Sequence, residues 1–289
     1  MKKIFTLVCL LIAFTLVLVS CGDAKFDTSK NITIVAREDG SGTKSAFMEL
    51  IDLKEKPDPA TAIQQPSTAA VLTEVKSNPS AIAYDSLGFV TDDVKKLKVD
   101  GVEATVANIK SGSYKISRPL SVVYKEATLD DAANNAFFTY LQSSDAQKII
   151  TDGGYVILND NAAAYTIDGE LSGKIDISGS TSLEPLMKDL VAAFKDLQPN
   201  ITITVAGGGS GTGRENAENG VSQFGMISSE FKQEQTPSCT YYTVCKDGIA
   251  VIVNKDNPLD NITMEQLKNI YDAEAGGDAI KVWNEIIKD

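Results

Sequence analysis

The stretch "IVAREDGSGTKSAF", residues 34–47, joins a β-branched run to a glycine-rich turn and then to an amphipathic segment. The run predicts a strand over residues 32–36, and the segment after the turn predicts a helix that begins near Thr43. A glycine-rich turn between a strand and a helix N-terminus leaves backbone N–H groups free to bind an anion. The stretch therefore predicts an α/β fold with an anion site at the end of a strand.

Two more turns of this kind occur in the second half of the chain, "GSTS" at residues 179–182 and "GSGT" at residues 209–212. Each offers hydroxyl groups and opens a predicted helix, whose N-terminus carries about half a positive charge. A single such turn is more often only a tight turn and a helix cap. Three in one chain favour one shared site for a tetrahedral oxyanion. Arg37 would bind two of its oxygens, and Asp39 would orient that guanidinium.

The rest of the pattern predicts alternating strands and helices, the signature of an α/β fold. Ser67 is expected to cap a helix that runs to about Ser77, and Thr263 a second helix near the C-terminus. Residues 130–154 form a long amphipathic stretch with a break near residues 143–144.

The composition excludes several classes of protein. The formal net charge is −12, with 27 Lys and Arg against 39 Asp and Glu, and no basic stripe indicates a nucleic-acid partner. The chain has no histidine, which excludes Ser-His-Asp and Cys-His nucleophile systems and histidine metal sites. No turn fits a Walker A loop or a dinucleotide fingerprint. No metal and no cofactor are therefore expected.

The first 20 residues predict a secretory signal peptide. Lys2 and Lys3 precede an apolar run over residues 4–19, which is short for a membrane-spanning anchor. Cys21 directly follows Leu-Val-Ser, which resembles a bacterial lipobox. The resemblance implies cleavage before Cys21, a lipid on its thiol and a polar tether over residues 21–30. The mature protein would be anchored at the extracytoplasmic face of the cell membrane.

Two cysteines remain in the mature chain, Cys239 and Cys245. In an exported protein two such residues can pair as a disulfide. Two reduced cysteines on a strand fit the sequence nearly as well, so both alternatives stay open here.

Four segments together resemble the phosphate-binding proteins of bacterial ABC phosphate transporters. They are residues 34–47, "GSTSLEPLMKDL" (179–190), "ITVAGGGSGTGRENAENG" (203–220) and "DGIAVIVNKDNPLDNITMEQLKNIY" (247–271). The resemblance implies an α/β, two-lobed clamshell of the type II periplasmic-binding-protein kind, without enzyme activity. It also implies inorganic phosphate as the ligand, ABC permease subunits as partners and a monomeric protein.

The resemblance implies ligand residues on all three turns. Those carried over are Arg37, Ser41, Gly42, Thr43, Thr181, Ser182 and Ser210. Gln223 is aligned with an acid of the family that accepts the proton of hydrogenphosphate, so we expect weaker discrimination against other oxyanions such as sulfate. The alternative is that Gln223 is a neutral replacement in a selective site, with Glu215 supplying an acceptor.

The order of the segments differs from that of the family, whose "GSTS" strand comes first. The chain is therefore expected to be circularly permuted; the alternative is a fragment of tandem copies. The strands at residues 117–123 and 248–254 would cross the hinge. One lobe would be continuous, 121–252, and the other split, 31–118 plus 255–289.

The sequence also fits functions other than phosphate transport. A binding protein for another tetrahedral oxyanion and a phosphate-sensing or adhesive surface lipoprotein both fit the sequence. A phosphate-ester hydrolase fits less well, because histidine and a metal-binding acidic cluster are lacking.

Overall fold

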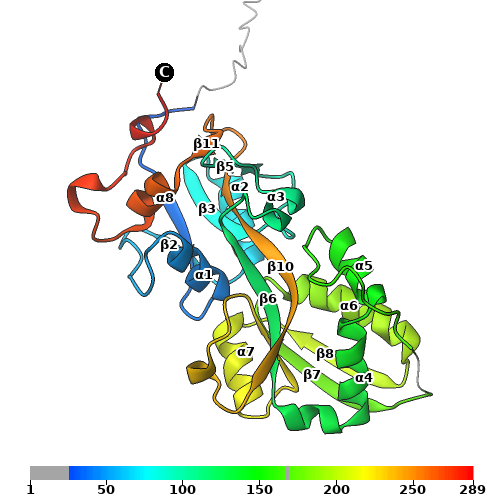
Figure 1. Cartoon of the computed structure of the whole chain (residues 1–289). Coiled ribbons are helices and arrows are strands. Elements are labelled where there is room, and N and C mark those ends of the chain that lie inside the picture. Colours follow the sequence, from blue (N-terminus) through cyan, green and yellow to red (C-terminus); the bar gives the residue numbers. More distant parts are fainter. Residues whose placement is uncertain (1–25, 167–168, 289) are drawn as a thin grey trace, which may run out of the picture.

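Two lobes lie at the two ends of an elongated molecule, joined by two long strands (Figure 1). The computed structural model describes residues 26–166 and 169–288. The predicted signal peptide and the lipidation site Cys21 lie outside the described residues. Within the described residues, no helix is both long and apolar enough to span a membrane.

The first lobe contains both ends of the described chain. Its N-terminal part comprises β1 (Thr33–Arg37), α1 (Gly42–Leu50), β2 (Ile63–Gln65), α2 (Thr68–Ser77), β3 (Ala81–Ser86), β4 (Lys95–Lys96), β5 (Lys98–Val99) and α3 (Val106–Lys110). Its C-terminal part adds β11 (Asn261–Ile262), α8 (Met264–Tyr271) and the short 3₁₀ helices Gly276–Asp278 and Trp283–Glu285.

The second lobe is one uninterrupted stretch of chain. It begins in β6 (Ser117–Tyr124) and continues through a 3₁₀ turn (Glu126–Asp130), α4 (Ala132–Leu141), α5 (Ser144–Asp152), β7 (Gly173–Gly179) and α6 (Glu184–Leu197). It ends with β8 (Ile201–Ala206), α7 (Gly209–Glu218), β9 (Phe224–Ile227), a 3₁₀ turn (Gln233–Gln235) and the start of β10 (Thr240–Val253).

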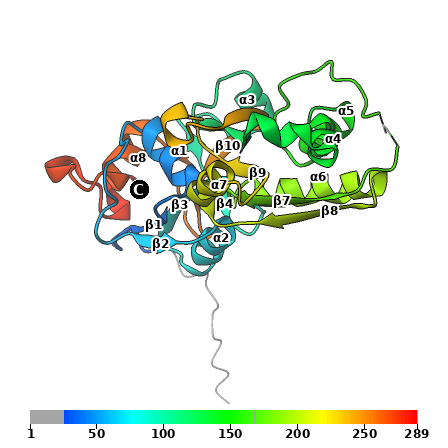
Figure 2. The ribbon, with the colours of Figure 1, turned by 90° about the horizontal axis from the view of Figure 1, so that it is seen from below.

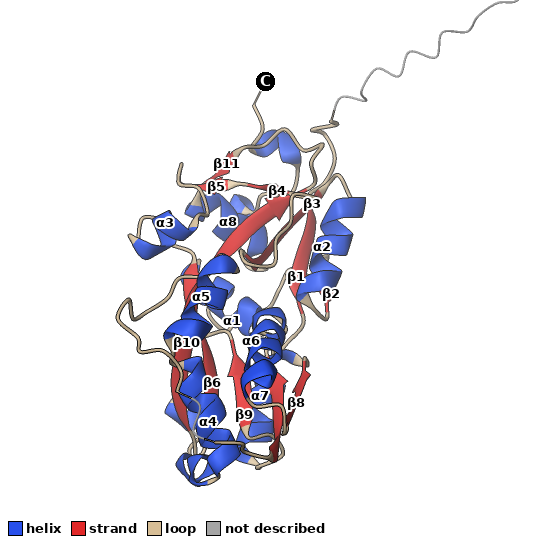
Figure 3. Cartoon of the chain, turned by 90° about the vertical axis from the view of Figure 1, so that its right-hand side faces the viewer, coloured by secondary structure: helices blue, strands red, loops and turns tan. Residues whose placement is uncertain are grey.

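The long strand β10 ties the lobes together (Figure 3). Its residues 240–248 pair with β6, and its residues 249–253 pair with β3 of the first lobe. The main sheet therefore runs through both lobes in the order β2-β1-β3-β10-β6-β9-β7-β8; β4 pairs with β10 beside this path, and β11 and β5 form a separate two-stranded sheet. Both strands expected at the hinge, 117–123 and 248–254, lie at this crossing.

Two hydrophobic cores lie on either side of the crossing. Residues between Ile32 and Ile116 pack with Ile249 and the strand that follows it, whereas Leu120 begins the core of the second lobe. Within β10, Val244 and Cys245 pack into the core of the second lobe, whereas Ile249 and the residues after it pack into the core of the first. The first lobe therefore takes residues 249–252, which the sequence analysis assigned to the continuous lobe.

The local signals in the sequence are confirmed at several helix ends. Ser67 caps α2 by accepting a hydrogen bond from the Ala70 N–H, and Thr263 caps α8 in a reciprocal capping box. The expected break in the amphipathic stretch separates α4 from α5, where Ser143 caps the second helix.

The two cysteines of the second lobe are free and buried. Cys245 lies in the large core of this lobe, and Cys239 lies in a separate small cluster with Val123 and Ile227. The two thiols pack into different clusters. The structure therefore has two free cysteines rather than a disulfide.

Candidate functional site

The three glycine-rich turns meet where the two lobes touch, and each opens a helix. In the first turn, Ser41 is the N-cap of α1: its hydroxyl accepts a hydrogen bond from the Lys44 N–H, and the residue is 2% exposed. In the second, the Ser180 hydroxyl accepts from the N–H groups of Ser182 and Leu183 just before α6. The third turn leads into α7 from Gly208, which has a φ of 141°.

Helix N-termini from opposite lobes face each other at this contact (Figure 2). Gly42 and Thr43 are the first two residues of α1, and Gly209 and Ser210 are the first two of α7. The first N–H groups of a helix have no partner inside the helix. Their partial positive charge makes this contact suited to an anion.

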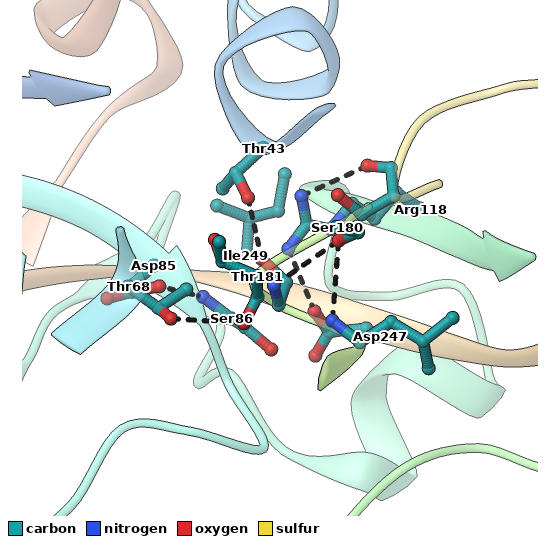
Figure 4. A network of polar contacts seen from close by, with 12 residues as sticks. Thr43, Thr68, Asp85, Ser86, Arg118, Ser180, Thr181, Asp247 and Ile249 are labelled. Atoms are coloured by element: carbon teal, nitrogen blue, oxygen red, sulfur yellow. Dashed lines mark hydrogen bonds and ion pairs between the residues drawn. The ribbon is translucent and has the colours of Figure 1, made fainter. Parts of the chain in front are cut away.

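Three hydrogen bonds join the lobes around the turns, and Figure 4 labels Thr43, Thr68 and Thr181, which take part in two of them. The hydroxyls of Thr43 and Ser182 are 2.8 Å apart. Thr68, at the start of α2, donates to the Thr181 carbonyl at 3.2 Å, and the Gly211 N–H donates to the Gly40 carbonyl at 3.0 Å. The structure is thus a closed arrangement of the lobes.

Position 42 requires a glycine because the two lobes approach each other closely there. A Cβ added at Gly42 would overlap the Ser210 hydroxyl and lie 2.6 Å from the Ser228 hydroxyl. Ser210 is itself fixed, because its hydroxyl accepts a hydrogen bond from the Ser228 N–H at 3.0 Å. Ser228 follows directly after β9, so three segments of chain converge on this point.

Arg37 ends β1 beside the turns and is 1% exposed. Its Nε donates to the Gln65 carbonyl at 3.1 Å, and its Nη2 donates to the Pro66 carbonyl at 3.0 Å. Its Nη1 has no hydrogen-bond partner within the described part of the chain. Burial lowers the pKa of Arg37, although not enough to discharge a guanidinium. The fixed guanidinium therefore keeps one N–H₂ group available for a ligand.

A second buried arginine connects the hinge to the turns. Arg118 on β6 donates to the Ser228 carbonyl at 3.0 Å, and it pairs with Asp247 of β10 at 3.2 Å. Burial raises the pKa of Asp247, and the Arg118 charge opposes this shift. Both side chains are 1% exposed, so removing either one would leave a buried charge unpaired.

The arrangement fits capture of an anion better than catalysis. Two guanidinium groups, several hydroxyls and two helix N-termini are donors for anionic oxygens. Within residues 26–166 and 169–288, no cluster of Cys, Asp and Glu could hold a metal ion.

A family model described as the PBP superfamily domain matches residues 25–145 and 164–289. The phosphate-binding protein PstS 2 of Streptococcus agalactiae serotype V is 39% identical over 267 residues, which cover 88% of this chain and 89% of the relative. This chain belongs to the PstS family of the PBP superfamily.

A solved structure agrees with the PstS assignment. The phosphate-binding protein of a phosphate ABC transporter from Streptococcus pneumoniae TIGR4 superimposes with a TM-score of 0.71 and 33% identity, covering 89% of this chain and all of the other. The PstS of Bacillus subtilis is 33% identical, but over only 50% of this chain and 47% of its own length. The fold is thus the two-lobed type II fold that the resemblance implied.

The structure brings together seven of the eight residues proposed as ligands of this PstS protein. They are Arg37, Ser41, Gly42, Thr43, Thr181, Ser182 and Ser210. These residues lie on the three turns or, for Arg37, at the end of the strand before the first turn.

Gln223 is the residue that the structure does not bring to the site. It precedes β9, whereas Ser228 at the other end of that strand is the residue beside the turns. The Gln223 side-chain oxygen accepts a hydrogen bond from the Asp176 N–H at 2.7 Å, and the backbone N–H of Gln223 donates to the Asp176 carbonyl at 2.9 Å. Both groups of Gln223 thus bond to Asp176 of β7, and the ligand role expected for Gln223 gains no support from this arrangement.

Two carboxylates also take other positions than expected. Asp39 does not orient Arg37: its side chain is 92% exposed and pairs with Lys44 at 2.8 Å. Backbone carbonyls orient the guanidinium instead. Glu215 is exposed on α7, so the alternative in which it supplies an acceptor gains no support.

Residues of the site that the sequence analysis missed are Asp85, Arg118, Ser228 and Asp247. Asp85, Arg118 and Asp247 share a usable signal, a charged residue inside or next to an apolar strand, where an unpaired charge is costly. Ser228 has no such signal, because its position is set by the register between β7 and β9.

Proposed function

We propose that this protein captures inorganic phosphate between its two lobes and delivers it to an ABC importer. The single observation that supports this most is the buried Nη1 of Arg37, which has no partner in the described residues and lies beside three hydroxyl-rich turns. A dianion loses much hydration on entering such a site, and many fixed donors must offset that loss. The names of the relatives point to the same ligand.

The test is calorimetric titration of the mature chain with phosphate, and then with sulfate. Binding of phosphate with a stoichiometry of one supports the proposal. A chain that is folded by circular dichroism and binds sulfate but not phosphate would instead favour the second candidate, a binding protein for another oxyanion. Hydrolysis of common phosphate esters would favour an enzyme, although the relatives carry the names of binding proteins.

The proposed site residues are Arg37, the six residues on the turns and Ser228. Ser228 joins the set because its hydroxyl lies 3.3 Å from that of Ser210 and its carbonyl is held by Arg118. Gln223 is left out because its side chain is bonded to Asp176.

The order of the chain is proposed to be a circular permutation of the order in relatives such as that of Bacillus subtilis. The partial coverage of that relative supports this, as does the contact between the chain ends. The Ile32 N–H donates to the Lys281 carbonyl at 2.8 Å, and the Asn284 N–H donates to the Thr28 carbonyl at 2.8 Å. Neighbouring ends are what permutation requires.

A rearranged gene tests the permutation. The new chain would begin at Ser172 and join residue 288 to residue 30 through a short glycine-serine linker. We expect it to fold and to bind phosphate as the natural chain does. Failure to fold, with the linker lengthened as a control, would contradict the permutation and favour a fragment of tandem copies.

The protein is further proposed to be a monomer, anchored through a lipid on Cys21 at the extracytoplasmic face of the cell membrane. The lipobox-like sequence before Cys21 supports the anchor. In a bacterium that processes lipoproteins, a fatty-acid label should be incorporated into the wild-type protein and not into Cys21→Ala. Absence of the label from the wild-type protein would contradict the lipid anchor.

A further inference from the structure

A buried carboxyl group lies next to Arg37 that the site described so far does not use. β1 and β3 are parallel neighbours, with Thr33 opposite Ala81 and Ile34 opposite Ile82. The paired residues end there, but the same offset continued along both strands leads from Arg37 to Asp85, and the two charges interact. Both residues are 1% exposed; Arg37 ends β1, and Asp85 is the last residue but one of β3. Figure 4 shows Asp85 beside Thr68, which in turn is bonded to Thr181.

Arg37 and Asp85 each keep one polar atom without a partner in the described residues. These atoms are Nη1 of Arg37 and Oδ2 of Asp85. The other carboxyl oxygen of Asp85 accepts a hydrogen bond from the Ser86 N–H at 2.8 Å. The two side chains form no ion pair with each other within 4.0 Å, in contrast to Arg118 and Asp247. A donor and a carboxyl group are thus both available to the same ligand.

The charge of Asp85 depends on what surrounds it. Arg37 on β1 and Arg118 on β6 favour the ionised form, and Asp247 on β10 disfavours it. The charge of Arg118 is already shared with Asp247. Burial outweighs these neighbours and raises the pKa of Asp85 to about 8.

Two buried tyrosines near this cluster remain protonated at neutral pH. The Tyr84 hydroxyl accepts a hydrogen bond from the Arg37 N–H, and burial raises the pKa of Tyr84 and of Tyr155, which packs against Gly88. Glu38 is the other acid close to Arg37, and it lies on the same strand connection.

We propose that Asp85 is a specificity-determining residue of the anion site, whose neutral carboxyl group donates its O–H to the bound oxyanion beside Arg37. The inference rests on the proposed function. An ionised Asp85 would repel a dianion. When Asp85 is neutral, the positive charge of Arg37 is available to pair with the ligand. At any pH at which Asp85 is ionised in the free protein, ligand binding must therefore be accompanied by the uptake of one proton. The preferred ligand is an oxyanion that presents an unprotonated oxygen to this carboxyl group.

The test is calorimetric titration with phosphate from pH 8 to 9.5, where phosphate is a dianion throughout, in two buffers with different enthalpies of ionisation. The wild-type chain is expected to take up close to one proton more than Asp85→Asn at the upper end of this range. Its affinity should fall towards tenfold per pH unit, while that of Asp85→Asn stays within about twofold. Asp93→Asn, an exposed carboxylate far from the turns, is the matched control and should behave like the wild type.

Equal proton uptake by the wild type and Asp85→Asn would overturn the inference and leave the proposed function intact. If Asp85→Asn does not fold, the wild-type chain alone still decides: an affinity that does not change from pH 8 to 9.5, with no proton uptake, overturns the inference. A folded wild-type chain that binds no phosphate at any pH overturns both this inference and the proposed function.

Discussion

The hydroxyl groups of Thr43 and Ser182 lie 2.8 Å apart, although 139 positions separate them in the chain. Thr43 is the second residue of α1 in the first lobe, and Ser182 lies on the turn before α6 in the second. The hydrogen bond between them can form only when the lobes are closed. Residues that would contact the anion therefore also contact each other across the lobes.

This bond predicts that Thr43 and Ser182 act as a unit. Thr43→Val and Ser182→Ala should each weaken phosphate binding about fivefold, because each loses one hydrogen bond, which contributes roughly 1 kcal/mol to the binding free energy. The loss of phosphate affinity in the double variant should be clearly smaller than the product of the two single losses, because the first substitution has already broken the hydrogen bond between the two residues. Calorimetric affinities of the four proteins give the coupling. Fully independent effects would contradict a shared role.

Gly42 should be the position at which a small side chain does most harm to closure. Gly42→Ala places a methyl group against the hydroxyls of Ser210 and Ser228, so the lobes must stay apart. We expect phosphate affinity to fall by about tenfold or more, equivalent to ~1.4 kcal/mol. The phosphate-dependent decrease in radius of gyration, measured by small-angle X-ray scattering, should be reduced.

The control for Gly42→Ala is Gly277→Ala, because an added Cβ at Gly277 meets nothing within 4 Å. This variant should bind phosphate and close as the wild type does. If Gly42→Ala closed equally well, the tight contact between α1 and α7 would not be a feature of the ligand-bound form.

Changes at Gln223 should leave ligand selectivity unaltered. Its side chain accepts a hydrogen bond from the Asp176 N–H and lies at the far end of β9 from the turns. Gln223→Ala should therefore keep the ratio of phosphate to sulfate affinity within about twofold and lower stability by about 1 kcal/mol. A large change in that ratio would restore the role that the sequence analysis gave to this residue.

Asp85 should make the stability of the free protein depend on pH. Its pKa of about 8 lies above the ordinary value of 3.8, so the folded chain binds one proton more than the unfolded chain between these values. The stability that this proton contributes is complete below about pH 4 and is lost as the pH rises through 8. By pH 7 the loss reaches on the order of 4 kcal/mol if Asp85 acts alone.

Asp85→Asn should remove that part of the pH dependence. Urea unfolding without phosphate, at pH 5 and at pH 8, would give the difference for the wild type and the variant. The variant should gain stability relative to the wild type as the pH rises, and Asp93→Asn should not. Parallel pH profiles of wild type and Asp85→Asn would show that Asp85 is not held neutral by burial.

Much of this site could be predicted from the sequence because its parts are local. A strand, a glycine-rich turn and a helix cap are written within a dozen residues, and all three turns open helices as expected. The contacts between turns could not be read in this way. They depend on strand register over long separations, which puts Ser228 rather than Gln223 beside Ser210.

The role of the buried charges could not be predicted for a related reason. Asp85 and Asp247 look alike in sequence, each a lone acid at an apolar strand. Only the fold gives Asp247 a close arginine partner and leaves one oxygen of Asp85 without a hydrogen bond in the described residues. Pairing of this kind is a property of the assembled sheet.

Titration of the mature chain with phosphate, compared directly with Arg37→Met, tests the central claim most directly. The wild type should bind one phosphate per chain. Arg37→Met should bind at least about 30-fold more weakly, because it loses a charge-assisted hydrogen bond of ~2 kcal/mol. A folded wild-type chain that binds no phosphate, or an Arg37→Met chain that binds as tightly as the wild type, would contradict the account.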